Sequence, residues 1–288
     1  MSPADVVEST TGRAAGAGVG SFFASELRTL LGRRRTWALL LVLAAIPVLI
    51  AVAVDLASNP PRPGEGPPFL DRVTSNGLFV AVTGLTVTIP LFLPLAVGVV
   101  AGDAIAGEAS LGTLRYLLTV PVGRTRLLAV KYLSSAVFCA VATLVVAVVG
   151  GLVGVALFGT GPVTLLSGDT VGTGAALLRV LLVAAYVTVS LLGLAAVGIF
   201  VSTLTEVPVG AMATTAVLAI VSQVLDGIPQ LGWLHPWLFS HRWLDYADLL
   251  REPIVWSSFA HNALLQAGYV VVFGLLAWAR FTTADVTS

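Results

Sequence analysis

The stretch RRRTWALLLVLAAIPVLIAVAVDL, residues 33–56, decides the fold class. Three arginines directly precede a run of about 20 apolar residues, Trp37–Leu56, that is interrupted only near its end by Asp55. A bilayer core about 30 Å thick is crossed by a helix of about that length. Basic residues that flank such a helix stay on the cytoplasmic side of the membrane. The stretch therefore predicts a membrane-spanning helix that begins at a cytoplasmic surface.

Five further apolar runs follow in a chain of 288 residues that is 57% hydrophobic and only 10% charged. Soluble domains carry roughly 25% charged residues, so a water-soluble globule is excluded. Because lipid offers no partner for backbone polar groups, we expect closed helices. The sequence predicts an all-α membrane protein in which one six-helix domain (21–280) lies between an N-terminal tail (1–20) and a C-terminal tail (281–288). The expected spans are Trp37–Leu56, Leu78–Ala101, Tyr132–Phe158, Ala175–Val201, Pro208–Leu225 and Phe259–Ala279.

The distribution of basic residues predicts the orientation. Ten of the 15 Lys and Arg residues lie before the first span, in the 103–131 loop or after the sixth span. By the positive-inside rule, the loop and both termini are expected in the cytoplasm. The stretch FFASELRTLLGRRR (22–35) predicts an amphipathic helix at the membrane surface. The aromatic-rich segment 227–258 predicts short helices that enter the outer leaflet.

The loop between the second and third spans, GEASLGTLRYLLTVPVGRTRLLAVK (107–131), has a helical pattern. Its apolar residues recur at helical spacing, and Glu108 and Ser110 occupy positions where they would cap the helix N-terminus. Pro121 would end the helix, because the residue before a proline is driven out of helical geometry. We expect a short cytoplasmic helix here, although a basic loop that serves only as a topology signal is the alternative. The apolar stripe consists of Leu111, Leu114, Leu117 and Leu118.

This loop resembles the corresponding loop of ABC-2 type transporter permeases. The shared pattern is a Glu, then Gly-Thr-apolar, an apolar pair, a Pro, an Arg, and a Lys that opens the next span. The resemblance extends to the six-span layout, the basic helix before the first span, the structured segment before the last span, and the ending ARFTTADVTS. The residues that carry the pattern are Glu108, Gly112, Thr113, Leu114, Leu117, Leu118, Pro121, Arg124 and Lys131.

The resemblance implies that the loop forms a coupling helix that docks on a separate ABC ATP-binding subunit. Glu108 would be a polar contact or a helix cap, and Gly112 a point of close backbone approach. Two permease chains, identical or different, would work with two ATP-binding subunits in a bacterial plasma membrane. The expected docking residues are Glu108, Leu111, Gly112, Thr113, Leu114, Arg115, Leu118, Pro121, Arg124 and Lys131.

The chain has no nucleotide-binding loop of its own. A P-loop requires Gly-Lys-Ser/Thr, and the only lysine, Lys131, lies between Val130 and Tyr132. We therefore expect no cofactor in this chain and no enzymatic activity, with ATP and Mg²⁺ bound by the partner. A zero net charge argues against nucleic-acid binding. His241, Asp245 and Asp248 would share a helix face, but solvated polar residues are the more common case, so we expect no metal site.

Pro90 and Pro94 are expected to bend the second span and to act as a hinge beside the coupling loop. The pair Gly150-x-x-x-Gly154 has the spacing that allows helices to pack closely. Few polar residues occupy the spans, which favours export of a hydrophobic or amphiphilic substrate. Two alternatives stay open: a stand-alone secondary transporter, disfavoured because no charge lies at the centre of a span, and a non-transporting membrane subunit of a partner complex.

Overall fold

The computed structural model describes residues 19–56, 76–111, 123–161, 163–164 and 169–283. Almost all of its regular structure is helical, and six helices are long and apolar enough to cross a membrane, in agreement with the predicted all-α membrane protein. These six are α3 (Arg34–Leu56), α6 (Phe92–Ser110), α8 (Arg124–Phe158), α9 (Thr173–Ser202), α10 (Pro208–Asp226) and α11 (Ser257–Thr283). The other α-helices are α2 (Val19–Gly32) and α5 (Leu78–Thr88). Two two-residue strands, β1 (Val163–Thr164) and β2 (Thr170–Val171), form an antiparallel pair that was not predicted.

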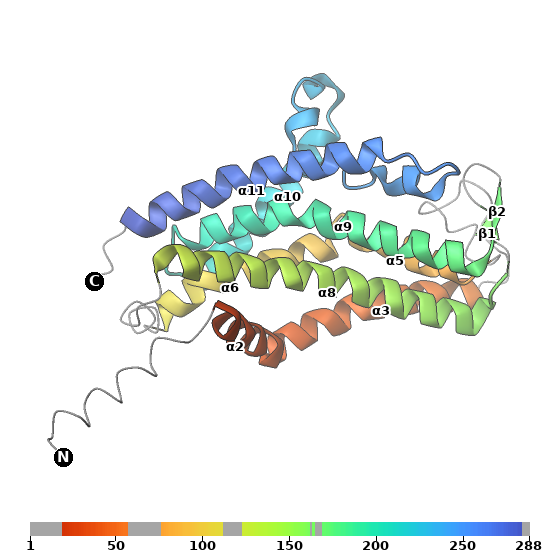
Figure 1. Ribbon diagram of the computed structural model, residues 1–288, viewed down its shortest axis with the longest axis horizontal. Helices are drawn as coiled ribbons and strands as arrows, with labels where there is room; N and C mark the ends of the chain where they lie inside the picture. Colours follow the sequence, from red (N-terminus) through yellow and green to blue (C-terminus); the bar gives the residue numbers. More distant parts are fainter. Residues whose placement is uncertain (1–18, 57–75, 112–122, 162, 165–168, 284–288) are drawn as a thin grey trace, which may run out of the picture.

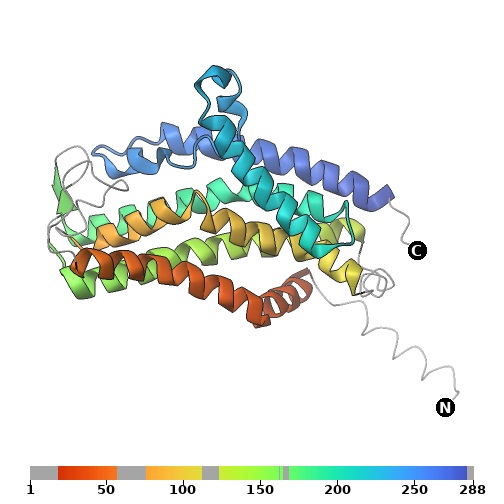
Figure 2. The same cartoon turned by 180° about the vertical axis from the view of Figure 1, so that it is seen from behind.

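The long helices form one bundle (Figure 1). α9 packs against α6, α8 and α11, whereas α5 lies on α8, and α10 lies on α6. The view from behind shows α10 crossing the bundle obliquely (Figure 2). Large side chains such as Tyr186, Phe138 and Leu194 are fully buried between these helices. The core is therefore made by the faces that the helices turn toward α8 and α9.

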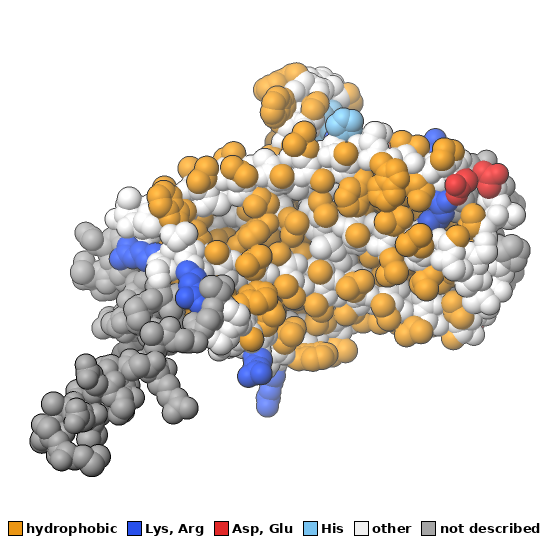
Figure 3. Space-filling view, viewed as in Figure 1, with side chains coloured by type: hydrophobic (Ala, Val, Ile, Leu, Met, Phe, Trp, Pro, Cys, Tyr) orange, Lys and Arg blue, Asp and Glu red, His pale blue; other side chains and the backbone are white. Residues whose placement is uncertain are grey.

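The outer surface of the bundle is apolar. Large apolar side chains on α3, α10 and α11, such as Leu41, Val209 and Leu264, are more than 60% exposed. On the face drawn in Figure 3, apolar side chains cover the middle of the bundle, and the charged side chains lie toward its two ends. Such a surface is stable against lipid and unstable against water, so the protein is a multi-pass membrane protein.

The predicted second span is wrong in one respect, because it is not continuous. α5 ends at Thr88 and α6 begins at Phe92, so Pro90 lies in the break. A proline lacks the N–H group that would continue the helical ladder, which explains the break. Pro94 lies in the first turn of α6, where that N–H has no intrahelical partner in any case. Whether the break acts as a hinge stays a prediction.

The boundaries around the 103–131 loop also differ from the prediction. α6 continues to Ser110, and α8 begins at Arg124, eight residues before the expected start of the third span at Tyr132. Glu108 and Ser110 therefore lie in the last turns of α6, and the helix that they were expected to cap lies outside the described residues. Both helices extend because their residues beyond the expected apolar runs are stabilised by packing and ion pairs at this end of the bundle.

The connection between α10 and α11, residues 227–256, is called the connecting segment below. Its regular parts are the 3₁₀ helices η1 (Pro229–Leu231), η2 (His235–Trp237) and η3 (Asp245–Leu250). Its first part projects from the side of the bundle, short of the end that carries β1 and β2 (Figures 1 and 2). Its last part is tied to α9 by the buried Arg179, whose Nη1 donates to the carbonyl oxygens of Leu249 and Arg251 at 2.8 and 2.7 Å.

The predicted close approach at Gly150 and Gly154 is confirmed. A Cβ atom on Gly154 would lie 2.0 Å from the carbonyl oxygen of Gly77, and one on Gly150 would lie 2.8 Å from the Cα of Ala81. The α8 glycines thus let α5 and the residue before it approach backbone to backbone. A similar contact was not predicted: a Cβ on Gly102 of α6 would lie 2.7 Å from the backbone nitrogen of Met212 in α10.

Candidate functional site: a charge cluster at one end of the bundle

Charged side chains from α2, α6, α8 and the start of α3 meet at one end of the bundle. This is the end at which α6 ends and α8 begins (Figure 1). Three carboxylates and three cations meet there, so their formal charges balance. We call this group the charge cluster: Glu26 of α2, Arg33 and Arg35 at the start of α3, Asp103 and Glu108 of α6, and Lys131 of α8.

Lys131 lies at the centre of one half of the charge cluster. Its side chain is only 3% exposed. Its Nζ lies 2.7 Å from Glu26 Oε1 and also pairs with Oε1 of Glu108. Removing a charge from water costs several kcal/mol, and such a group is stable only where opposite charges and hydrogen bonds replace its hydration. Lys131 therefore holds α2, α6 and α8 together through two carboxylates.

Asp103 lies at the centre of the other half. Its side chain is 9% exposed, and its Oδ2 accepts from Arg33 Nη1 at 2.7 Å and pairs with Arg35. Gly107, one helical turn further along α6, leaves room for this carboxylate, because a Cβ there would lie 2.7 Å from Asp103 Oδ1. The two arginines are about 40% exposed, so solvent screens them in part. Asp103 thus ties the start of the first span to α6.

A hydroxyl group of α9 forms hydrogen bonds with the backbone of α6 beside Asp103. Ser202 Oγ donates to the carbonyl oxygen of Gly102 at 2.7 Å. It also accepts from the backbone N–H groups of Ile105 and Ala106 at 3.0 and 2.9 Å. These three hydrogen bonds attach the hydroxyl to the backbone of α6 between Gly102 and Ala106. The part of α6 that carries Glu108 is therefore joined to the end of α9.

The structure brings together two of the residues that the sequence singled out, Glu108 and Lys131. Arg124 lies nearby and donates to the carbonyl oxygens of Phe281 and Thr282 in α11 at 3.1 and 3.0 Å. Leu111 is 74% exposed directly after α6. Pro90 and Pro94 lie at the break between α5 and α6, away from the charge cluster. The other predicted docking residues, Gly112, Thr113, Leu114, Arg115, Leu118 and Pro121, lie outside the described residues, as does most of the predicted coupling helix.

Sequence reasoning missed the partners of the two central residues. The sequence pattern gives Arg33 and Arg35 a role only in topology and does not single out Asp103. Their pairing joins positions separated by about 70 residues, which no local pattern reveals. One signal was available: Asp103, Glu108 and Lys131 are charges next to apolar runs, where a charge is costly unless it is paired. Ser202 carried no such signal.

The charge cluster joins the helices on both sides of residues 111–123. Glu108 lies two residues before the end of α6, and Lys131 lies in the third turn of α8, so their ion pair joins the two helices that flank residues 111–123. A displacement of that loop would change the distance between Glu108 and Lys131. Lys131 is also paired with α2, and α6 is bonded to the start of α3 and to α9.

A family model described as a protein of unknown function (DUF2705) matches residues 43–287. The match runs from the first span through the last and includes all of the charge cluster except the three residues of α2 and the start of α3. No curated protein matches the chain.

Proposed function

The chain belongs to the DUF2705 family, and since that membership assigns no activity, we propose one from the residues. We propose that the chain is the membrane-spanning subunit of an ATP-driven ABC-2 type exporter, with both termini and the charge cluster on the cytoplasmic side. In this role it works in the plasma membrane of a bacterium.

The Glu108–Lys131 pair is the observation that carries this proposal. A permease that is driven by a separate ATP-binding subunit needs a cytoplasmic element whose movement reaches the spans. Residues 111–123 are flanked by the helices that this buried pair joins, and Lys131 also binds Glu26 of α2. A push on the loop would therefore be passed to α2, α6 and α8 together. This arrangement supports the assignment of Glu108 to Lys131 as the coupling region.

The nucleotide belongs to the partner subunit in this proposal. The chain's only lysine is ion-paired within the charge cluster, and it is not part of a P-loop. ATP and Mg²⁺ would be bound by a soluble ATP-binding protein that docks on the loop that begins at the exposed Leu111. ATP binding would move the coupling region, and the charge cluster would carry that movement into α6 and α8.

A second permease chain would complete the transporter. α10 is apolar on its exposed face, and the connecting segment beside it projects from the bundle with Trp233 and Trp237 more than 70% exposed. Irregular backbone at membrane depth is stable where protein covers it, and a neighbouring permease would supply that cover. A path between two such apolar surfaces suits a hydrophobic or amphiphilic substrate.

The test is co-purification of the full-length chain with the ATP-binding protein encoded beside it. The informative variant is Leu111→Asp, which places a charge on the exposed residue at the start of the proposed docking surface. The matched control is Leu204→Asp, because Leu204 is also exposed, at 51%, in the turn between α9 and α10. We expect wild type and L204D to retain the ATP-binding protein and L111D to lose most of it.

Two results would contradict the proposal in different ways. Wild type that retains no ATP-binding protein removes the exporter assignment and favours a secondary transporter or a membrane subunit of another complex. Equal retention by wild type, L111D and a variant with all four stripe leucines replaced by Asn keeps the exporter but removes the docking assignment. Monodisperse elution of every variant in detergent is the control for folding.

A further inference from the structure

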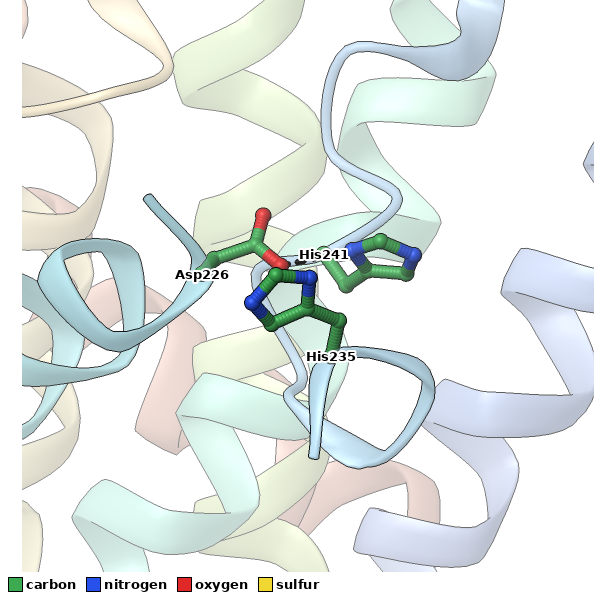
Figure 4. A group of neighbouring side chains, drawn as sticks. All are labelled: Asp226, His235 and His241. Carbon is green, nitrogen blue, oxygen red and sulfur yellow. Dashed lines mark hydrogen bonds and ion pairs between the residues drawn. The ribbon is translucent and has the colours of Figure 1, made fainter. Parts of the chain in front are cut away.

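Asp226, His235 and His241 converge where α10 meets the connecting segment (Figure 4). Asp226 is the last residue of α10, His235 opens η2, and His241 lies in the turn that follows η2. One ligand atom from each side chain lies within 4.8 Å of the other two. His241 Nδ1 lies 2.6 Å from Asp226 Oδ1, and the two imidazole rings lie 5.8 Å apart between centroids. Two of the three histidines in the chain thus meet at one carboxylate.

From this geometry we propose that these three side chains bind one divalent transition-metal ion of the Zn²⁺ class. Two imidazole nitrogens and one carboxylate oxygen are a ligand set that suits zinc and its neighbours, whereas Mg²⁺ and Ca²⁺ prefer oxygen ligands alone. Three protein ligands leave a further position for water. Each of the three groups is partly exposed, so an ion and its water can reach them.

The hydrogen bond of His235 supports its role as a ligand. Its Nε2 lies 3.0 Å from the carbonyl oxygen of Ile228, and a carbonyl only accepts, so Nε2 carries the proton. In the neutral ring the other nitrogen then keeps its lone pair, and that nitrogen lies on the side of the Asp226 carboxylate (Figure 4). A backbone carbonyl that orients a histidine in this way is the usual second partner of a metal-bound imidazole.

The ion takes the place of the proton between His241 and Asp226. Nδ1 of His241 faces the carboxylate, and for this nitrogen to bind a metal its proton must leave or move to Nε2. The carboxylate then neutralises part of the charge of the ion, as it would that of the proton. The existing pair therefore places two ligands on the same side of the site before the ion arrives.

Metal binding would fasten the connecting segment to the break in the second span. A cavity of about 250 Å³ beside the site is lined by Asp226, His241, Pro90 and Gln223 among others. The side-chain amide of Gln223 donates to the carbonyl oxygen of Pro90 at 2.6 Å. An ion bound by Asp226 and the two histidines would link the two ends of residues 226–241 and hold this loop beside the break between α5 and α6. The inference concerns these residues alone and does not depend on the proposed export activity.

The test uses the full-length protein in detergent after treatment with EDTA. Zn²⁺ binding is measured by calorimetry, and Co²⁺ binding by its visible absorption, whose intensity reports the coordination number. The variants are Asp226→Asn, His235→Gln and His241→Gln. The matched control is His261→Gln, which removes the third histidine, an exposed residue of α11 outside the cluster. We expect wild type and H261Q to bind one equivalent, and each of the other variants to bind at least about tenfold more weakly.

A second measurement needs no variant. Diethyl pyrocarbonate modifies accessible imidazoles, and mass spectrometry identifies the modified residues. We expect Zn²⁺ to protect His235 and His241 and to leave the modification of His261 unchanged. Equal Zn²⁺ affinity in wild type and H235Q, or equal modification of His235 with and without Zn²⁺, would overturn the site. Displacement of Co²⁺ by equimolar Mg²⁺ or Ca²⁺ would overturn the assignment to a transition metal.

Discussion

At the scale of single residues, the position of Lys131 explains how a charged group is tolerated inside this bundle. Its ammonium group is almost completely removed from solvent, yet it lies between the carboxylates of Glu26 and Glu108. Such a pair adds little stability compared with apolar packing, but breaking it by removing one partner leaves buried charges without compensation. The value of Lys131 is therefore that it specifies which faces of α2, α6 and α8 meet.

We predict that Lys131→Met destabilises the protein by about 3–5 kcal/mol, because two carboxylates would then face each other in a poorly hydrated place. The measurement is the apparent melting temperature in detergent, followed by circular dichroism. The triple variant K131M/E26Q/E108Q is the control and should recover part of the loss, since it leaves no unpaired charge. Arg34→Ala, at an exposed position, should melt with the wild type. A K131M protein as stable as the wild type would contradict the prediction.

At the scale of elements, helix contacts depend on where glycines remove side chains. Gly154 and Gly150 lie against α5 and the residue before it. Gly151 lies on another face of α8, and among the described residues an added Cβ there would meet Leu78 Cδ2 alone, at 4.0 Å. The spacing of the two packed glycines was visible in the sequence. The sequence did not reveal which helix these glycines contact, because glycine spacing within one helix does not identify the neighbouring helix.

We predict that Gly154→Val destabilises the protein by about 1–3 kcal/mol or more, because its Cβ would overlap the backbone at Gly77. The neighbouring variant Gly151→Val is the matched control and should be close to the wild type in stability. The measurement is the fraction of protein that elutes as a monodisperse species from detergent, before and after a heating step. Equal losses in the two variants would mean that helix propensity, and not the α5 contact, limits α8.

The elements also show what apolar pattern and local signals can predict. The spans α3, α9, α10 and α11 begin and end within four residues of their predicted bounds, because the apolar runs are long and bounded by charges or prolines. At Pro90 the sequence predicted a bend in one continuous helix, whereas the structure has a break between two helices. The early start of α8 and the late end of α6 were missed because the charge cluster stabilises helix where the apolar pattern has already stopped.

The connecting segment was the least predictable element. Aromatic density indicated a membrane interface, but the segment folds as 3₁₀ turns and not as α-helices. His241 consequently does not share a face with Asp245 and Asp248. It pairs with Asp226, whereas Asp245 pairs with Arg242, and Asp248 with Arg251. Periodicity presupposes a regular helix, and this segment has no such helix to which the spacing rule applies.

At the scale of the whole molecule, the orientation in the membrane is open to a direct test. The two ends of the bundle differ in basic charge, and the more basic end is expected in the cytoplasm. Cys139 is completely buried, so the native chain gives little background in thiol labelling. We predict that Arg251→Cys reacts with a membrane-impermeant maleimide in intact cells and that Arg34→Cys reacts only after permeabilisation. The reverse result would invert the protein and place the charge cluster outside.

The candidate site was predictable only in part for a reason that concerns the whole molecule. The loop motif identified Glu108 and Lys131, which are 23 residues apart, and the structure pairs them. The rest of the charge cluster is assembled by tertiary packing: Glu26 lies 105 residues from Lys131, and Arg33 lies 70 residues from Asp103. Residues this far apart in the sequence are brought together by the arrangement of the helices, and no local stretch of sequence specifies that arrangement.

The isolation of the only lysine side chain has a practical consequence. Reagents that acylate primary amines need an exposed, unprotonated amine, and in this chain the single ε-amino group is enclosed between two carboxylates. Acylation of Lys131 is therefore expected to be very slow in the state described here. It should accelerate only when the joint between α2, α6 and α8 opens. The rate at which Lys131 is acylated, measured by mass spectrometry of the peptide that contains it, therefore reports how often that joint is open.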